Sequence, residues 1–237
     1  MSWIDKAVAR ENEILRIIGI CNRAHVEPVL VGGYAVSAFG RHRFSVDCDA
    51  AVPRSAVPRL QRILRNEGYE LKVEKAGFDQ VYGGQFRSFS KKVMGFPVTV
   101  DLLIESLASR STSASWSYTY IKKHSVPGVV AGIEQSVNVT VPEKELLVAF
   151  KIHAGRGTDV RDIVILSGDL DLEKVRAHIQ RGEAKMLRGQ LEKGLEMLDD
   201  PRFLPSLKGV FTIRGDVSKR ILTTKRMLGR LLALLPR

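Results

Sequence analysis

The segment from residue 29 to residue 52 constrains the fold of this chain more than any other part of the sequence. It begins as an apolar strand, turns at Gly32-Gly33, passes through a short helix over 34–39 and a basic loop, and enters a strand that carries Asp47 and Asp49. Glycines at a strand-to-helix turn let the backbone, and the N–H groups that open the helix, approach a large anion. This order of parts predicts a two-metal site facing a triphosphate.

The two aspartates of the second strand are expected to act together. Side chains alternate between the faces of a strand, so Asp47 and Asp49 should share one side while Cys48 points to the other. Neighbouring carboxylates repel each other unless a cation lies between them, and Mg²⁺ is the natural candidate because it prefers oxygen ligands. A glycine pair or an Asp-x-Asp sequence is common by itself. Their spacing within one strand–turn–helix–strand unit favours a functional site.

A third carboxylate interrupts a later apolar run. Residues 97–104 read as a buried strand in which Asp101 is the single acid. Burying an isolated carboxylate is costly unless a partner or a metal compensates its charge. Asp101 therefore either joins the metal site or lies at a strand end, hydrogen-bonded to the backbone.

These residues resemble the DNA polymerase β superfamily of nucleotidyltransferases, through Gly32-Gly33, Asp47-x-Asp49 and Asp101. A second block, 145–166, is similar to the lysine helix and the following Arg-Asp helix start of the AbiEii and MenT-type nucleotidyltransferases, the toxins of type IV toxin–antitoxin systems. The resemblance covers about 29–166. It implies an α+β, polymerase β-like fold with a mixed sheet flanked by helices, followed by a C-terminal helical region.

The resemblance also implies roles for individual residues. Asp47 and Asp49 would hold the metals, Mg²⁺ or alternatively Mn²⁺, with Asp101 as the third carboxylate. Lys151 would contact the phosphates of an NTP co-substrate, and Asp162 would act near the reacting centre, as a base for the acceptor hydroxyl. Considered without the resemblance, Lys151 reads as a helix lysine that extends to solvent. Asp162 alone reads equally well as an ion-pair partner of a neighbouring arginine, Arg161 or Arg156.

Nucleotide binding would involve the glycine turn and the loop that follows it. Gly32 and Gly33 would approach the phosphates, and Arg43 and Ser45 correspond to the basic and hydroxyl residues that often precede the first metal-binding aspartate. The chain departs from the family pattern at one point, because many relatives carry Gly-Ser where this sequence has Gly-Gly. A hydroxyl contact to the phosphates is therefore missing at Gly33, although backbone N–H groups remain.

Length and composition limit the class of protein to which this chain can belong. A chain of 237 residues can bury a substantial core. The sequence contains no apolar run of bilayer-spanning length and no secretory pattern at its start, so a cytoplasmic protein without membrane association is expected. Its two cysteines, Cys21 and Cys48, indicate neither a disulfide framework nor a thiolate zinc site. The histidines show no ligand spacing, and His42 reads as a solvated loop residue rather than a substrate contact.

The excess positive charge is concentrated at the C-terminal end. The chain has a net charge of +11, and residues 208–237 contain eight Lys or Arg side chains but one acid, Asp216. Apolar residues recur there at helical spacing, which predicts one amphipathic helix with a basic face, capped by Asp216 or Ser218 and closed by Pro236. Such a helix can bind the phosphates of a nucleic acid, lie on an anionic membrane, or dock its apolar face on the core.

The remaining pattern predicts a catalytic half over 1–141 and a helical half over 142–237, with the active site in the cleft between them. The polar segment 111–115 reads as a surface linker or as a mobile loop that closes over substrate. The expected helices are 3–24, 56–67, 143–154, 160–166, 172–181 and 185–198 and the tail, and the expected strands include 69–74, 80–89 and 96–104 with short strands within 126–141.

Three functions agree with these features. The leading one is transfer of NMP from an NTP to RNA, with the 3′ end of tRNA as the acceptor that the resemblance suggests and a cognate antitoxin as a further partner. The second is transfer to an aminoglycoside- or lincosamide-type antibiotic or to a protein. Cationic drugs call for an acidic cleft, which this basic chain offers less obviously. The third is a non-catalytic RNA-binding module of the same fold.

Overall fold

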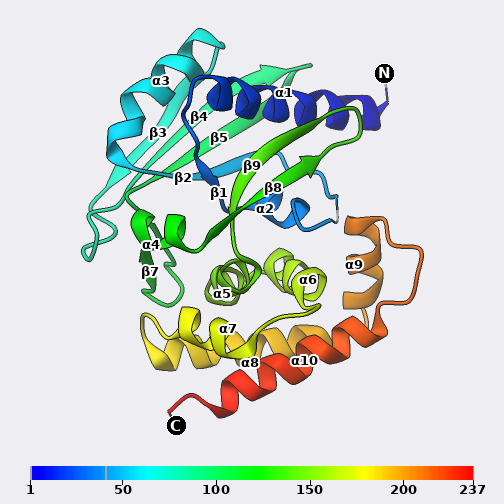
Figure 1. Cartoon of the computed structure of the whole chain (residues 1–237). Helices are drawn as coiled ribbons and strands as arrows, with labels where there is room; N and C mark the ends of the chain where they lie inside the picture. The colour runs from blue at the N-terminus through cyan, green and yellow to red at the C-terminus, as the bar shows by residue number, and fades with distance from the viewer. Residues whose placement is uncertain (1, 41, 237) are drawn as a thin grey trace. The chain divides into compact units, whose positions relative to one another are not determined.

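The computed structural model describes residues 2–40 and 42–236 of the chain (Figure 1). The chain divides into two compact units. Unit 1 comprises Met1–Leu107 and Trp116–Pro142, and unit 2 comprises Ala108–Ser115 and Glu143–Arg237. We describe each unit by itself.

Unit 1 is built on a seven-stranded mixed sheet with the strand order β3-β4-β5-β2-β1-β9-β8. β1 pairs in parallel with β9 and β2 pairs in parallel with β5, whereas the other neighbours are antiparallel. Two further short strands, β6 and β7, form a separate sheet. The strands are β1 (Val29–Leu30), β2 (Asp47–Val52), β3 (Glu70–Ala76), β4 (Gln85–Val93), β5 (Phe96–Ile104), β6 (Ser106–Ala108), β7 (Ser115–Ser117), β8 (Ser125–Ala131) and β9 (Ser136–Pro142).

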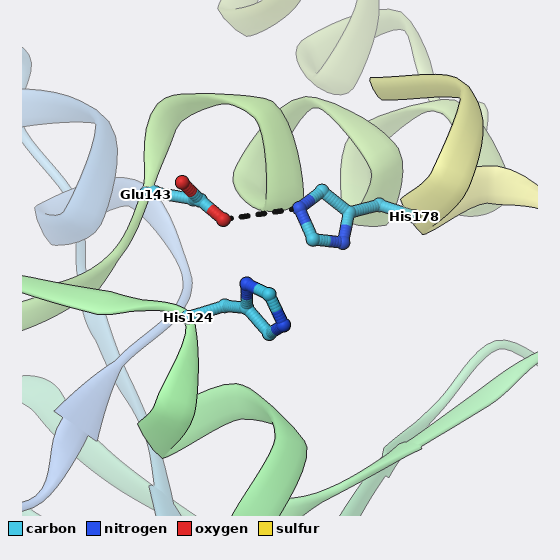
Figure 2. Close-up of side chains that lie close together, drawn as sticks. All are labelled: His124, Glu143 and His178. Atoms are coloured by element: carbon cyan, nitrogen blue, oxygen red, sulfur yellow. Dashed lines mark hydrogen bonds and ion pairs between the residues drawn. The ribbon is translucent and has the colours of Figure 1, made fainter. Parts of the chain in front are cut away.

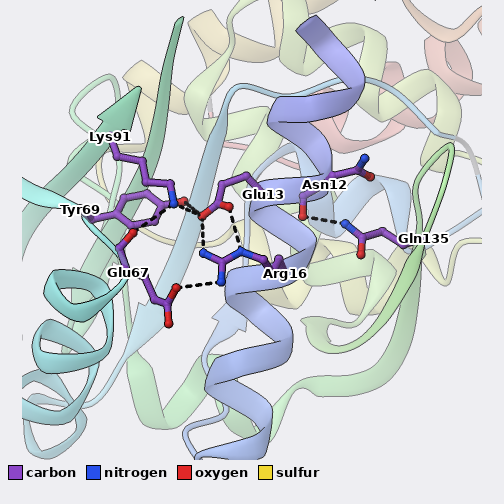
Figure 3. Close-up of polar contacts among 7 residues, drawn as sticks. All are labelled: Asn12, Glu13, Arg16, Glu67, Tyr69, Lys91 and Gln135. Atoms are coloured by element: carbon purple, nitrogen blue, oxygen red, sulfur yellow. Dashed lines mark hydrogen bonds and ion pairs between the residues drawn. The ribbon is translucent and has the colours of Figure 1, made fainter. Parts of the chain in front are cut away.

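Helix α1 (Trp3–Arg23) covers one face of this sheet, as its apolar spacing predicts (Figure 1). It begins with a capping box in which Ser2 and Asp5 satisfy each other's backbone N–H groups. Ion pairs on the polar side of this helix attach it to neighbouring elements. Arg16 bonds both Glu13, at 2.9 Å, and Glu67, at 2.8 Å, and Lys91 of β4 also reaches Glu13 (Figure 3).

Helix α3 (Val57–Asn66) follows a 3₁₀ turn, η1 (Arg54–Ala56), and tolerates Pro58 in its first turn. It ends just before Gly68, which adopts a φ of +82° that favours glycine. Leu60 and Leu64 of this helix are buried. The helix therefore ends where Gly68 predicts.

The hairpin formed by β3 and β4 differs from its prediction. A strand was expected over 80–89, but β4 spans Gln85–Val93 and residues 77–84 form the connection. Asp79 causes the difference, because its buried carboxylate accepts hydrogen bonds from the N–H groups of Val81 and Tyr82 and binds the Ser106 hydroxyl. An aspartate that bonds the backbone two residues on makes a turn. Helix α4 (Tyr118–Lys123), which Ser117 caps, was also not predicted.

Unit 2 is helical. Helix α5 is apolar on nearly every side and buried from Leu146 to His153, so the other helices surround it. It packs on α6 and α7 and also contacts α8, and α10 packs on α8. The helices are α5 (Lys144–Ala154), α6 (Gly157–Leu166), α7 (Leu172–Ile179), α8 (Ala184–Asp199), α9 (Phe203–Phe211) and α10 (Ser218–Ala233).

The predicted amphipathic tail helix is confirmed as α10, and a further helix, α9, which the pattern did not predict, precedes it. α9 ends at Thr212, which adopts a left-handed φ of 49°, and α10 restarts at Ser218. Asp216 marks that start by accepting from the N–H of Ser218. The apolar face of α10, including Leu228 and Leu231, is buried within unit 2, so it docks on the core and leaves its basic face to solvent. Arg237, the last basic residue counted, lies outside the described residues.

The observed α+β architecture confirms the predicted fold class: a mixed sheet flanked by helices, followed by C-terminal helices. Among the described helices, none combines the length and the apolar character that crossing a membrane requires.

Segment 108–115 is held firmly within unit 2 and is not a loose loop. Thr112 is 1% exposed, and its hydroxyl lies 2.6 Å from Nδ1 of His153, while Nε2 of His153 lies 2.9 Å from the Ile179 carbonyl oxygen. The Thr112 carbonyl in turn accepts from the N–H of Glu183. These contacts fit a neutral imidazole that donates from Nε2 and accepts at Nδ1.

Burial lowers the pKa of His153 from 6.5 to about 4. Because the folded-state pKa is lowered, the corresponding stability is present above pH 6.5 and is lost as the pH falls toward 4. We expect His153→Gln to weaken this acid sensitivity. Between about pH 7.5 and pH 5, the wild type should lose about 2 kcal/mol more unfolding free energy than the variant, measured by urea titration. Equal losses in both proteins would contradict the assignment of a neutral buried imidazole.

Candidate active site

Three carboxylates lie on two neighbouring parallel strands of unit 1. Asp49 of β2 is the register partner of Asp101 of β5, and Asp47 lies two residues earlier on β2. Cys48, between them, is 2% exposed. Val100 and Leu102, on either side of Asp101, are also buried. The pleat therefore places Asp47, Asp49 and Asp101 on the face opposite to these buried side chains, as the alternation predicts.

The environment of Asp101 is unfavourable for an ionised carboxylate. Burial raises its pKa to about 6, the charges of Asp49 and Asp47 add to this increase, and a hydrogen bond from Ser88 opposes it. Oxygen Oδ1 of Asp101 is buried and has no hydrogen-bond partner among the described residues. This buried oxygen receives no hydrogen bond from the part of the chain that the structure describes, and it lies beside two further carboxylates. Carboxylate oxygens are the ligands that a hard divalent cation prefers. These residues therefore fit a metal site.

The glycine turn is packed directly against this cluster. Gly32 is the N-cap of the short helix α2 (Gly33–Ser37). A Cβ atom at Gly32 would lie 1.9 Å from Oδ2 of Asp49, which no side chain allows. Gly32 is thus required because the Asp49 carboxylate occupies the space that a side chain would fill.

Gly33 faces the two residues that precede the first aspartate. A Cβ atom there would lie 2.8 Å from Nη2 of Arg43 and 2.9 Å from Oγ of Ser45. The Ser45 hydroxyl donates to the Asp47 carbonyl at 3.2 Å. The hydroxyl that the Gly-Gly pair lacks is therefore matched by another one, Ser45 Oγ, next to the same backbone position.

We expect the two glycines to differ in their tolerance of alanine. Gly32→Ala must displace Asp49, and we expect it to cost about 1–3 kcal/mol of unfolding free energy, the usual penalty of overpacking. Gly33→Ala is the matched control, because Arg43 has a long and flexible side chain that can move. Urea titrations of both variants measure the difference, and equal penalties would contradict the close packing of Gly32 on Asp49.

The other predicted site residues lie in unit 2 and form a cluster of their own. Lys151 is 6% exposed, and its Nζ lies 2.8 Å from Asp162 Oδ2 and 3.1 Å from Asp159 Oδ1. Lys151 therefore does not extend to solvent. Arg156 bonds Asp159 at 2.7 Å, and Asp162 pairs with Lys151.

Asp159 connects this cluster and was not among the predicted site residues. It is the third residue of α6 and accepts from the N–H of Arg156, the residue that caps this helix. Burial alone would raise the pKa of Asp159, but Lys151 and Arg156 lower it below its usual value. The signal was present in the spacing, because an acid at this helix position often closes a capping box.

His42 is bonded to a buried carboxylate of unit 1, and 32% of its side chain is exposed. Its Nε2 lies 2.5 Å from Oε1 of Glu11, a carboxylate that is 1% exposed. The other oxygen of Glu11 accepts from the N–H of Ile133 in the turn between β8 and β9. The loop that leads into Asp47 is thereby anchored at His42.

Glu143 and His178 make a further polar contact within unit 2. His178 Nε2 lies 3.1 Å from Glu143 Oε1 (Figure 2), and Lys174 bonds the other carboxylate oxygen at 3.1 Å. Because Glu143 precedes α5 and the other two residues belong to α7, these contacts join the start of α5 to α7.

Comparisons with known proteins locate the fold but not the family. No family model matches the chain, and no curated protein matches it. A candidate nucleotidyltransferase from H. pylori aligns over 98% of this chain and 96% of its own, with 18% identity and a TM-score of 0.49. JHP933 from Helicobacter pylori aligns over 96% and 92%, with 17% identity and a TM-score of 0.50. The chain therefore shares its overall fold with JHP933.

Proposed function

We propose that this chain is a Mg²⁺-dependent nucleotidyltransferase that transfers NMP from an NTP to an acceptor hydroxyl and releases pyrophosphate. The observation that carries the proposal is the pairing of Asp49 with Asp101 across two parallel strands, with a buried oxygen of Asp101 that has no hydrogen-bond donor among the described residues. Ordinary structural carboxylates are paired or solvated. The buried Oδ1 of Asp101 therefore supports the proposal that a cation binds here.

Asp47, Asp49 and Asp101 would hold the metal, with Mn²⁺ as the alternative ion. When bound, a divalent cation neutralises the negative charge that develops in nucleotidyl transfer. Three carboxylates on one sheet face would hold the ion in a fixed position, because strands β2 and β5 are joined by a continuous register from Asp47 to Val52. Rigid positioning matters here, since the protein contributes mainly orientation and charge to this class of reaction.

The turn at Gly32 and Gly33 is proposed to receive the nucleotide phosphates. Because these residues have no side chains, the carboxylate of Asp49 lies directly against the backbone of the turn. Arg43 and Ser45, which lie against Gly33, supply a guanidinium and a hydroxyl at the same place. Arginine suits this role because its planar group can bond two phosphate oxygens at once.

Lys151 and Asp162 are proposed as the functional pair of unit 2, following the resemblance. Lys151 would contact the nucleotide phosphates, and Asp162 would accept the proton of the acceptor hydroxyl. The ion pairs with Asp159 and Asp162 hold the lysine ammonium in one place. A lysine fixed in this way loses less conformational freedom on binding than an exposed one.

RNA is the proposed acceptor, with the tRNA 3′ end and a toxin role, opposed by a cognate antitoxin, as the more specific form. The net charge of +11 and the exposed basic face of α10 favour a polyanion. The alternatives are an antibiotic or a protein acceptor. A non-catalytic RNA-binding module is the alternative outside enzymes, and nucleotide turnover separates it from the others.

The test is incubation of the purified protein with Mg²⁺, each α-phosphate-labelled NTP in turn, and total RNA. We expect label on an RNA of tRNA size with the wild type, and none with the double variant Asp47→Ala/Asp49→Ala. Label on protein or on an added aminoglycoside, but not on RNA, would replace RNA with that acceptor. Nucleotide binding without any transfer would favour the non-catalytic module.

A further inference from the structure

Helix α3 of unit 1 exposes a face made of arginines. Arg59, Arg62 and Arg65 are exposed, and no acidic residue occurs between 53 and 66. Within the described part of the chain, none of these three guanidiniums has a recorded ion pair or hydrogen bond. At a rise of 1.5 Å per residue, Arg59 and Arg65 lie about 9 Å apart along the helix axis. Three unneutralised cations in a row raise the local positive potential.

The opposite face of α3 excludes one explanation for this charge. A basic helix that binds a membrane inserts its apolar face into the lipid. The apolar face of α3 is already used, because Val57, Leu60 and Leu64 are 5%, 2% and 1% exposed within unit 1. The arginine face therefore has only polar side chains to offer, and a polyanion in solution is the ligand that fits it.

A cavity lies at the start of the same helix, also within unit 1. Its volume is about 400 Å³, and its polar lining comprises His25, Glu27, Ser55, Arg59, Tyr118 and Lys122. Two of these residues, Arg59 and Lys122, are cations, against one acid, Glu27. Arg59 belongs to both the cavity and the arginine face, which makes the two one continuous surface.

This surface is separate from the carboxylate cluster. Val52 and Pro53 line the cavity and stand at the end of β2. Asp49 lies three residues earlier on that strand, which at the strand rise amounts to roughly 10 Å. A ligand held on α3 would therefore not occupy the candidate active site.

We propose that the arginine face of α3 and the cavity at its start bind the phosphate backbone of RNA, with one phosphate held between Arg59 and Lys122. Guanidinium groups bond phosphate oxygens in pairs, and each such contact releases a counterion from the nucleic acid. The inference deepens the proposed function and rests on it for the identity of the polyanion. It assigns RNA binding to unit 1 in addition to the basic face of α10.

The test compares two triple variants of the full chain that lose the same charge. Arg59→Gln/Arg62→Gln/Arg65→Gln removes the proposed surface, and the control Lys72→Gln/Lys75→Gln/Lys92→Gln removes three lysines from β3 and β4 of the same unit. Fluorescence anisotropy measures binding of a labelled single-stranded oligouridylate and of bulk tRNA across a salt series. Urea titration establishes that both variants are folded.

We expect the arginine variant to bind RNA at least about 10-fold more weakly, with the slope of log K against log salt reduced by about 2, because three phosphate contacts are lost. The control should bind like the wild type. Equal weakening of both variants, or unchanged binding by the arginine variant, would overturn the proposal. So would preferential binding of anionic phosphatidylserine vesicles over RNA.

The same variants separate this proposal from the proposed function. Asp49→Ala should bind RNA normally even though it transfers nothing, because its carboxylate lies outside the α3 surface. If the arginine variant loses RNA binding while no protein shows transfer, the surface stands and the enzymatic proposal fails. If the arginine variant labels RNA as well as the wild type does, the enzymatic proposal stands and the proposed RNA-binding surface is wrong.

Discussion

Asp49→Ala is expected to abolish nucleotidyl transfer while leaving the fold intact. Asp49 links the two parts of the candidate site. It is the register partner of Asp101 in the carboxylate cluster, and it occupies the space beside Gly32 in the glycine turn. Its removal should lower the rate of label transfer by at least about 10³-fold, the upper range for loss of one preorganised electrostatic group. The rate of labelled-NMP transfer under saturating NTP is the measurement.

The matched control is Glu70→Gln, which removes one exposed carboxylate from β3 of the same sheet, where it pairs with Lys72. This variant should transfer label at the wild-type rate. Urea titrations of both variants should give unfolding free energies within about 1 kcal/mol of the wild type, as for most substitutions outside a packed core. Unchanged turnover by folded Asp49→Ala would remove Asp49 from the site.

Asp101→Asn is expected to stabilise the metal-free protein and to inactivate it. Because the folded-state pKa of Asp101 is raised from 3.8 to about 6, the favourable contribution is present below pH 3.8 and is lost as the pH rises through 6. At neutral pH the ionised carboxylate is therefore a cost. Asparagine removes that charge, and we expect about 1–2 kcal/mol more unfolding free energy in the presence of a chelator, after allowance for solvent screening.

Added Mg²⁺ should make the wild type more stable than Asp101→Asn, the reverse of their order in chelator. A cation that binds the folded state stabilises it by mass action. The wild type should gain stability with increasing Mg²⁺, whereas Asp101→Asn should gain little, and the comparison needs only thermal unfolding with and without the ion. If Asp101→Asn is less stable than the wild type in chelator, Asp101 is a structural carboxylate and the metal assignment is wrong.

Local rules predicted the core of the candidate site because each part depends on its near neighbours. The two-residue period of a strand was enough to place Asp47 and Asp49 on one face and Cys48 on the other. The glycine pair predicted a tight turn, and the structure adds the physical reason, which is the carboxylate of Asp49 next to Gly32. The pairing of Asp49 with Asp101 joins residues 52 positions apart, and the resemblance, not the pattern, brought them together.

Other features depend on tertiary contacts that no local pattern encodes. Segment 111–115 is small and polar, as in a loop, yet His153 and Glu183 bind it from elsewhere in unit 2. Helix α9, which ends at the left-handed Thr212, was not predicted, whereas the helix after it, α10, was predicted from its own apolar spacing. Lys151 looked like an exposed helix lysine because its partners, Asp159 and Asp162, lie on the following helix.

Direct titration of the protein with Mn²⁺, followed by electron paramagnetic resonance, tests most directly whether Asp47, Asp49 and Asp101 form a divalent metal site. Free Mn²⁺ gives a six-line signal that weakens when the ion is bound. We predict saturable loss of this signal with the wild type, competition by Mg²⁺, and no loss with the folded triple variant Asp47→Asn/Asp49→Asn/Asp101→Asn. Equal Mn²⁺ binding by the wild type and the triple variant would contradict the proposed site.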